Sequence, residues 1–246
     1  MAFLLVALLM IAMPAVPDGT VDPWSDALAA RDLEAIEHLL DGGRVNPNRT
    51  TPDGKTALMF AAQQADAEVV VRLLAAGANV NATNANGGTP LMYAALGGDS
   101  GITGLLLDAG ARHDLQAKLG WTALALAAVK GYAPVARTLL DAGADQRIRD
   151  AYGWTPLMRA AHNGRGEIVR LLLDSPGADV SARQEGGATV LHIAAGIGDA
   201  EIVQLLLTHG ADRLAKDGNG NTAAIVATLA GHVELTGFLE ASDPAR

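Results

Sequence analysis

The chain of 246 residues repeats itself with a short, constant period, and this period constrains its fold more than any other feature. A threonine preceded by Gly-x recurs at Thr56, Thr89, Thr122, Thr155, Thr189 and Thr222, so that all intervals but one are equal. The glycine of Leu-Leu-x-x-Gly-Ala recurs in the same register, at Gly77, Gly110, Gly143, Gly177 and Gly210. Both series slip by one position near Asp174, so a single insertion explains both. A fixed period of about 33 residues predicts a stack of similar supersecondary units.

Each unit is predicted to contain a tight turn and two short helices. Asn86-Gly87 favours a turn, and the threonine that follows each turn glycine suits the N-cap of a helix. Pro90 then occupies the first helical position, where proline is tolerated. Paired alanines such as Ala94-Ala95 let the first helix approach its neighbours closely. The second helix carries apolar residues at spacings of three and four, and it ends at Gly-Ala.

This plan resembles the ankyrin repeat, whose signature is Thr-Pro-Leu-His-x-Ala within about 33 residues. The corresponding tetrads here read TALM, TPLM, TALA, TPLM, TVLH and TAAI. The resemblance covers the chain from Asp22 onward. It implies an all-α solenoid of stacked helix-turn-helix repeats with short hairpin tips and a cap at each end. It also implies a local hydrogen bond for His192, which alone keeps the family's histidine, so we expect the other turns to be held less firmly.

The period places one elongated repeat domain at residues 22–246. We expect five full repeats between an N-terminal cap at about 22–50 and a C-terminal capping repeat at 217–241; the repeats lie at about 51–83, 84–116, 117–149, 150–183 and 184–216. Both caps are expected to present polar outer faces, because solenoid ends need them for solubility. Gly101 and Gly104 each lower helix propensity by up to about 1 kcal/mol, so the second helix of repeat 84–116 is expected to be the weakest.

The chain begins with an unbroken apolar run at positions 2–13. This run is shorter than the roughly 20 residues of a membrane-spanning helix, and Pro14 and Pro17 follow it. With Ala15 as the last residue before cleavage, the pattern indicates a secretory signal peptide at 1–15 and a short linker at 16–21. No lysine or arginine precedes the run, which leaves two alternatives: an uncleaved anchor, or a start site placed downstream of a basic region.

Composition excludes several classes of function. A net charge of −9 and a pI near 5.0 argue against nucleic acid as a partner. The absence of cysteine excludes disulfides and thiolate metal sites, and the six histidines show no metal-ligand spacing. Gly54-Lys55-Thr56 lacks the upstream glycine of a phosphate-binding loop. Asn48 and Asn81 begin Asn-x-Thr sequences, which we interpret as repeat-end residues and not as glycosylation sites. We therefore expect no enzyme activity, no cofactor and no metal.

The hairpin tips and first helices of such a stack line one concave face, where side chains are free to contact a partner. Trp121 and Trp154 are one repeat apart, so they occupy equivalent places on adjacent tips, roughly 10 Å from each other. Buried aromatic side chains often dominate the energy of a protein interface. We therefore predict a partner-binding surface with a basic rim, made by Lys118, Leu119, Trp121, Lys130, Arg149, Tyr152, Trp154, His162 and Asn163. The alternative is that both tryptophans only pack on neighbouring tips, as Phe60 and Tyr93 are assigned to the core.

The sequence thus predicts a monomeric, non-catalytic module that binds a partner protein on its concave face in the periplasm, with no membrane contact after signal cleavage. Each repeat touches only its neighbours, so no single centre exists where a deep catalytic pocket would form. Two alternatives use the same surface. One is a secreted effector that binds a host or competitor protein, and the other is a glycan or small-molecule carrier with the tryptophans as its platform.

Overall fold

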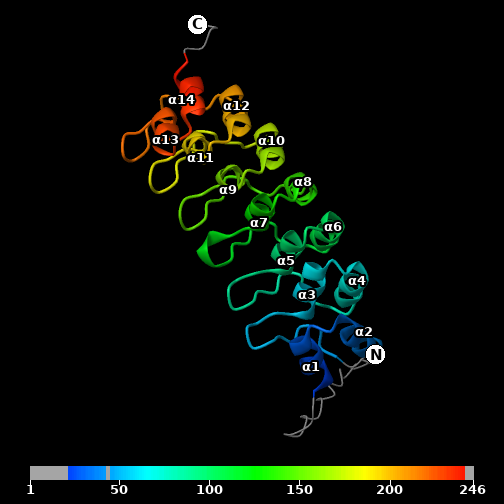
Figure 1. The fold of residues 1–246 in the computed structure, drawn as a ribbon. Coiled ribbons are helices and arrows are strands. Elements are labelled where there is room, and N and C mark those ends of the chain that lie inside the picture. The colour runs from blue at the N-terminus through cyan, green and yellow to red at the C-terminus, as the bar shows by residue number, and fades with distance from the viewer. Residues whose placement is uncertain (1–21, 43–44, 242–246) are drawn as a thin grey trace, which may run out of the picture.

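The computed structural model describes residues 22–42 and 45–241, so the expected signal peptide and linker lie outside the described residues. Fourteen α-helices in these ranges form two columns (Figure 1). The inner column contains α1 (Pro23–Ala30), α3 (Ala57–Gln64), α5 (Pro90–Gly97), α7 (Ala123–Lys130), α9 (Pro156–His162), α11 (Val190–Ile197) and α13 (Ala223–Leu229). The outer column contains α2 (Leu33–Asp41), α4 (Ala67–Ala75), α6 (Ser100–Asp108), α8 (Ala133–Asp141), α10 (Gly166–Asp174), α12 (Ala200–Thr208) and α14 (Val233–Glu240).

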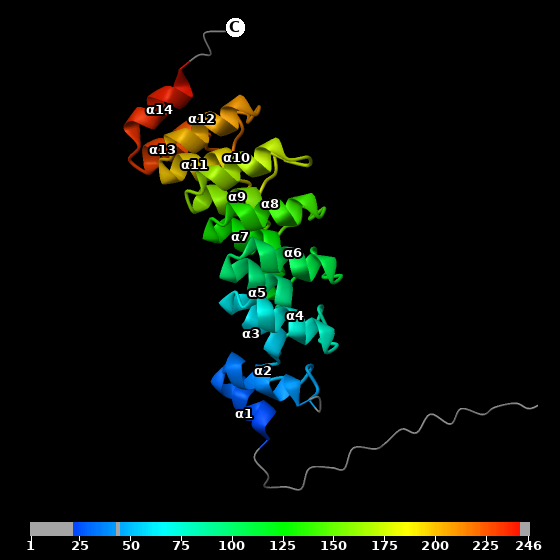
Figure 2. The ribbon, with the colours of Figure 1, turned by 90° about the vertical axis from the view of Figure 1, so that its right-hand side faces the viewer.

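The helix pairs stack in chain order into an elongated solenoid, which confirms the predicted all-α repeat architecture (Figures 1 and 2). Loops project from the inner column on one side of the stack, as expected for hairpin tips. Only two isolated bridges, Thr50 to Thr56 and Arg183 to Thr189, have β character within the described residues. A short 3-10 helix, η1 (Lys118–Gly120), forms one of the tips. The N-terminal unit is a complete helix pair, α1 and α2.

Alanines allow the inner helices to pack closely. Both members of every predicted alanine pair are fully buried, at Ala61, Ala62, Ala94, Ala95, Ala127, Ala128, Ala160, Ala161, Ala194 and Ala195. Gly97 lets α5 approach α3 closely, because a Cβ on it would lie 2.7 Å from the Gln63 carbonyl oxygen of α3. The core is therefore a series of thin layers between consecutive pairs, and it has no single centre.

The threonine hydroxyls cap the inner helices even where the family histidine is missing. Thr89 Oγ1 accepts the Met92 N–H at 3.3 Å, and Thr122 Oγ1 accepts the Ala125 N–H at 3.2 Å. His192 adds three contacts. Its Nδ1 accepts the Thr189 N–H at 3.2 Å and lies 2.8 Å from Thr189 Oγ1, and its Nε2 lies 3.0 Å from the Asn221 carbonyl oxygen of the next repeat. The histidine therefore links two repeats, whereas the other units keep only the local cap.

Consecutive tips are joined by backbone hydrogen bonds at every step along the stack. The bonds run from Ala85 N to Asp53 O, Lys118 N to Asn86 O, Ala151 N to Leu119 O, Glu185 N to Tyr152 O, and Gly218 N to Gly186 O, at 2.8 to 3.2 Å. The turn glycines allow this approach, since a Cβ on Gly120 would lie 2.7 Å from the Asp150 Cα. The tips thus form a continuous, regular wall.

Asn48 and Asn81 serve the stacking of repeats, in agreement with their interpretation as repeat-end residues. The Asn81 amide donates to the Gly110 carbonyl at 3.0 Å and accepts the Arg112 N–H at 2.8 Å. Asn48 makes the matching pair of bonds to the Gly77 carbonyl and the Asn79 N–H. Each side chain therefore spans one repeat boundary.

The C-terminal end differs from the expected polar cap. Glu234 and Glu240 are exposed, but so are the apolar side chains of Leu229, Val233 and Phe238, with Leu229 at 76% exposure. These apolar residues lie on or beside α13 and α14, the last helix pair among the described residues. The cap is therefore only partly polar.

Two glycine substitutions should change stability in opposite directions. Gly187 has φ of +77°, and an added Cβ would lie 2.7 Å from the Gly218 nitrogen, so Gly187→Ala should lower the free energy of unfolding by at least about 1 kcal/mol. Gly104 lies within α6, and no atom lies within 4 Å of an added Cβ, so Gly104→Ala should raise it by up to about 1 kcal/mol. Urea denaturation followed by circular dichroism measures both changes. A result of the opposite sign for either variant contradicts this account.

Acid should destabilise the stack through its aspartate turns. The Arg147 side chain lowers the pKa of Asp145, the Ser181 hydroxyl lowers that of Asp179, and the Asn221 N–H lowers that of Asp217. A carboxyl whose pKa is lowered by folding stabilises the protein above its unfolded pKa, near 3.9, and this stabilisation is lost as pH falls through the folded value. We expect the Tm to stay level from about pH 7 to 5 and to fall below about pH 4. A Tm that rises as the pH falls from about 5 to below 4 would contradict a stabilising role for these aspartates.

Candidate partner-binding face

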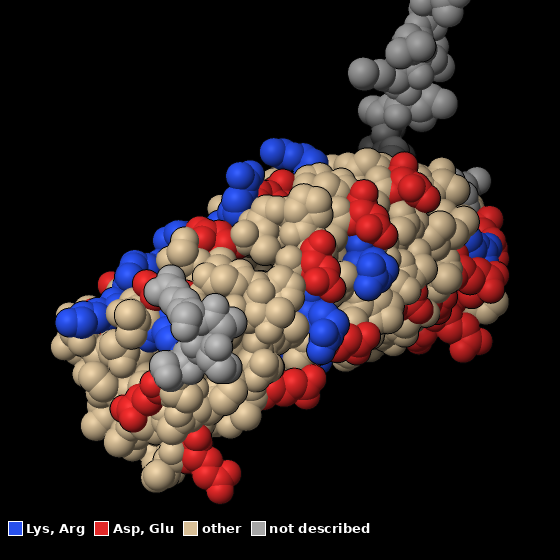
Figure 3. Space-filling view, turned by 90° about the horizontal axis from the view of Figure 1, so that it is seen from above, with Lys and Arg blue, Asp and Glu red and all other residues tan. Residues whose placement is uncertain are grey.

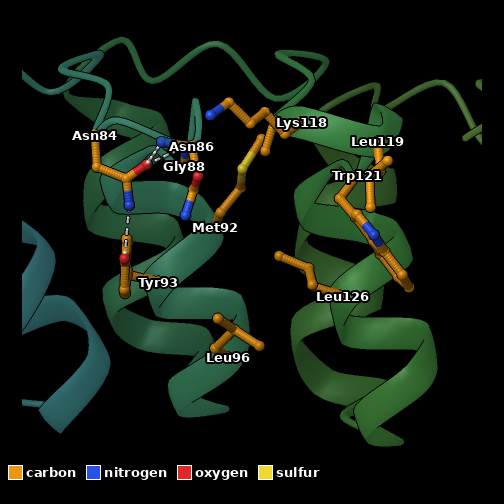
Figure 4. A pocket seen from close by; sticks show the side chains of 11 residues that line it. Asn84, Asn86, Gly88, Met92, Tyr93, Leu96, Lys118, Leu119, Trp121 and Leu126 are labelled. Carbon is orange, nitrogen blue, oxygen red and sulfur yellow. Dashed lines mark hydrogen bonds between the residues drawn. The ribbon is translucent and has the colours of Figure 1, made fainter. Parts of the chain in front are cut away.

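An apolar groove of about 620 Å³ lies between the tips and inner helices of repeats 84–116 and 117–149 (Figure 4). Helix α5 contributes Tyr93 and Leu96, and α7 contributes Leu126. Leu96 and Leu126 face each other across the lower part of the groove, and Lys118 lies at its top. The inner helices therefore supply the apolar lining of the groove, and the tips supply its polar edge.

Asn84 holds in place the side of the groove that repeat 84–116 forms. Its Oδ1 accepts the N–H groups of Asn86 at 2.9 Å and Gly88 at 2.8 Å, which closes the turn. Its Nδ2 donates to the Tyr93 hydroxyl at 2.8 Å, as the dashed line in Figure 4 shows. Tyr93 is therefore half-buried and held in place at the groove, in contrast to its assignment to the core; Phe60, at the same position of the preceding repeat, is buried as expected.

The two tryptophans contact the same guanidinium group. The Cζ of Arg159 lies 4.7 Å from the Trp121 ring centroid and 4.6 Å from that of Trp154. His162 then meets Trp154 edge to face, with ring centroids 5.2 Å apart and an angle of 87°. Arg159 thus joins the tryptophans of two adjacent tips, through contacts that are favourable for aromatic rings and cations. These side chains extend the concave face from the groove to the end of α9.

Asp150 holds this arginine. Its Oδ2 accepts Arg159 Nε at 2.8 Å and Nη2 as well, and its Oδ1 accepts the N–H groups of Tyr152 at 2.9 Å and Trp154 at 3.0 Å. The Asp150 side chain is 3% exposed and that of Arg159 is 17% exposed. One buried carboxylate therefore fixes both the tip and the guanidinium.

The structure brings only part of the predicted surface together. Lys118, Leu119 and Trp121 line the groove. Trp154 and His162 belong to the neighbouring group of side chains around Arg159. Tyr152 projects from its tip with 51% exposure. These six side chains come from neighbouring tips and inner helices.

The other three predicted residues lie elsewhere. Lys130 and Asn163 lie at the C-terminal ends of α7 and α9, and Asn163 donates to the Arg159 carbonyl at 2.8 Å. Arg149 donates to the Arg183 carbonyl at 2.9 Å and lines a separate hollow with Gln146 and Asp179. Its side chain therefore links two repeats, and it does not form a basic rim with Lys118.

Sequence reasoning missed Arg159, Asp150, Leu96 and Leu126. The repeat register contained the signal, because Asp150 and Arg159 stand two repeats after Asn84 and Tyr93 and make the equivalent turn-to-helix contact. Leu126 occupies the same position in the repeat between them. Comparing this one position across repeats would have singled out Tyr93, Leu126 and Arg159.

Charge on the molecule is unevenly distributed. Many lysine and arginine side chains lie along the upper left edge of the view in Figure 3, and acidic side chains are spread over the rest of that face together with a few more basic ones. Among the described residues there is no cluster of His, Asp or Glu that could hold a metal ion. Within the same residues, no helix has the length and apolar character needed to cross a membrane.

Asp150→Asn should lower the free energy of unfolding by about 1–3 kcal/mol, because it removes the charge partner of a largely buried arginine. Asp217→Asn is the matched control. Asp217 accepts two turn N–H groups at 2.9 Å, from Asn219 and Asn221, and no arginine bonds to it among the described residues. Urea denaturation, with tryptophan fluorescence as the signal, measures both. Equal losses in the two variants would show that the arginine contact contributes nothing.

Comparisons with known proteins agree with this architecture. A family model described as ankyrin repeats (3 copies) matches residues 25–117, 98–184 and 177–244. The crystal structure of the human ASB11 ankyrin repeat domain has a TM-score of 0.77 and 28% sequence identity to this chain, with 91% of this chain and 100% of that chain covered. A search of curated proteins gives no match. The constant repeat period, the two columns of helices and the family match together show that the chain belongs to the ankyrin-repeat family.

Proposed function

We propose that this chain is a non-catalytic module that binds a partner protein on its concave face. Ankyrin repeats generally mediate binding between proteins, and this family supplies the coarse function. The finer assignment, to the face formed by the groove and the arginine–tryptophan stack, is our inference.

The observation that carries the assignment is the exposure of large apolar side chains at adjacent tips beside an apolar groove. Leu119 is 56% exposed and Tyr152 is 51% exposed. Both stand on a wall of tips joined by backbone hydrogen bonds, so little conformational entropy is lost when a partner docks. Exposed apolar area next to a concave surface is typical of interaction sites.

We further propose that the protein acts in the periplasm after export. Support comes from the apolar run at 2–13 and the prolines that follow it, which suit a cleaved signal peptide. Fractionation of the native cell with an antibody to the repeat domain tests the location. Recovery in the cytoplasmic fraction would contradict export, and recovery in the medium would favour the secreted-effector alternative.

Substitution of two tip residues should abolish capture of the partner. The purified protein and its Leu119→Ser, Tyr152→Ser double variant are used as baits in a periplasmic extract of the native host. We expect the wild-type protein to retain a partner and the double variant to recover at least about tenfold less of it, because exposed tip side chains are proposed anchors.

Val71→Ser is the matched control for this capture. Val71 is 49% exposed, but it lies on the outer helix α4, away from the tips. The control should recover as much partner as the wild-type protein. Equal recovery by the double variant would place the binding site on another face.

A further inference from the structure

We propose that the groove between repeats 84–116 and 117–149 binds a segment of the partner protein that carries a large apolar side chain next to a carboxylate. The inference rests on the proposed function and specifies the chemistry that the partner presents. The apolar side chain, aromatic or long aliphatic, enters between Leu96 and Leu126, and the carboxylate pairs with Lys118 at the edge.

The groove has the size and lining of a binding site for a side chain. Its volume of about 620 Å³ lies within the roughly 300–1,000 Å³ range of ligand pockets. Tyr93, Leu96, Leu126 and Trp121 are all half-buried, so each leaves apolar surface in contact with water. An inserted side chain would cover that surface and gain the free energy of apolar burial.

The charge at the groove favours a single carboxylate. Lys118 is exposed and is the one charged residue among the described residues that line the groove. The neighbouring cation, Arg159, is already paired with Asp150. The chain carries a net charge of −9, which repels a strongly acidic tract at long range. One acid beside one apolar side chain therefore fits this site better than a run of acids.

Leu119 provides a second, independent argument. Its φ of +62° and ψ of +16° are left-handed, a conformation that favours glycine or asparagine over leucine. The equivalent residues of the neighbouring tips are Asn86 and Tyr152, and neither has a positive φ. An exposed leucine held in a strained backbone at the mouth of a groove is typical of a site where local stability is sacrificed for contact.

Peptide selection tests the proposal directly. Random peptides displayed on yeast are selected on the purified protein, and the recovered sequences are synthesised with a fluorescein label and titrated by anisotropy. We expect the recovered peptides to share Trp, Phe or Leu next to Asp or Glu. Lys118→Glu should weaken binding of these peptides, and it should leave versions in which the acid is changed to its amide unaffected.

Leu96→Asp should weaken peptide binding at least about tenfold, because it places a charge on the apolar floor. The control is Leu229→Asp. Leu229 occupies the same repeat position, four repeats further along the chain, and is 76% exposed at the C-terminal end. This variant should bind as the wild-type protein does. Circular dichroism confirms that both variants are folded.

Leu119→Asn gives a readout that loss of folding cannot imitate. Asparagine adopts the left-handed conformation more readily, so we expect the Tm to rise by about 2–4 °C while peptide binding weakens. A rise in Tm without weaker binding would remove Leu119 from the site.

Several results would overturn the proposal. These are recovered peptides without the apolar–acid pair, equal weakening by Leu96→Asp and Leu229→Asp, displacement of the label by a peptide of residues 2–13, and a dimer that Leu96→Asp converts to a monomer. The last two would assign the groove to the chain's own N-terminal segment or to a second copy. If the captured partner is lost with the double tip variant but retained by Leu96→Asp, the proposed function stands and the groove assignment falls.

Discussion

The close approach of consecutive hairpin tips is the constraint on which the rest of the structure depends. At each turn glycine the backbone is left-handed, and at Gly120 and Gly187 the next tip lies so near that a Cβ would come within 2.7 Å of its backbone. The same approach permits the backbone hydrogen bonds between tips. Stacking distance, tip direction and the concave face therefore all follow from one small residue per repeat.

Most of the fold was predictable because the repeat multiplies each weak signal. A single Gly-x-Thr sequence means little, but six in register fix the turn, the N-cap and the start of the inner helix. The C-terminal end was predicted less well. Glu234 and Glu240 suggested a polar cap, but the sequence pattern does not show which apolar side chains of the last described helix pair stay uncovered, and Leu229 is one of them at 76% exposure.

The candidate site contains part of the surface that the sequence predicted, together with residues that the sequence did not single out. Trp121 and Trp154 stood out because tryptophan is rare in the chain, and their equivalent positions followed from the period. The guanidinium that joins them was missed, because Arg159 lies on an inner helix among apolar residues and its partner Asp150 lies in a turn. Arg149 was included on charge alone, although its side chain reaches the backbone of the next repeat.

Helix α6 backs the repeat that forms one side of the groove, and it contains Gly101 and Gly104. In a linear stack of repeats, the free energy of local unfolding of one repeat depends on that repeat and on its interfaces with its two neighbours. We therefore expect α6 to open at a lower energetic cost than the other outer helices while the hydrogen-bonded tips stay in register. A weaker outer helix at this place would let the groove change its width and accept side chains of different shape. The remaining repeats would stay aligned.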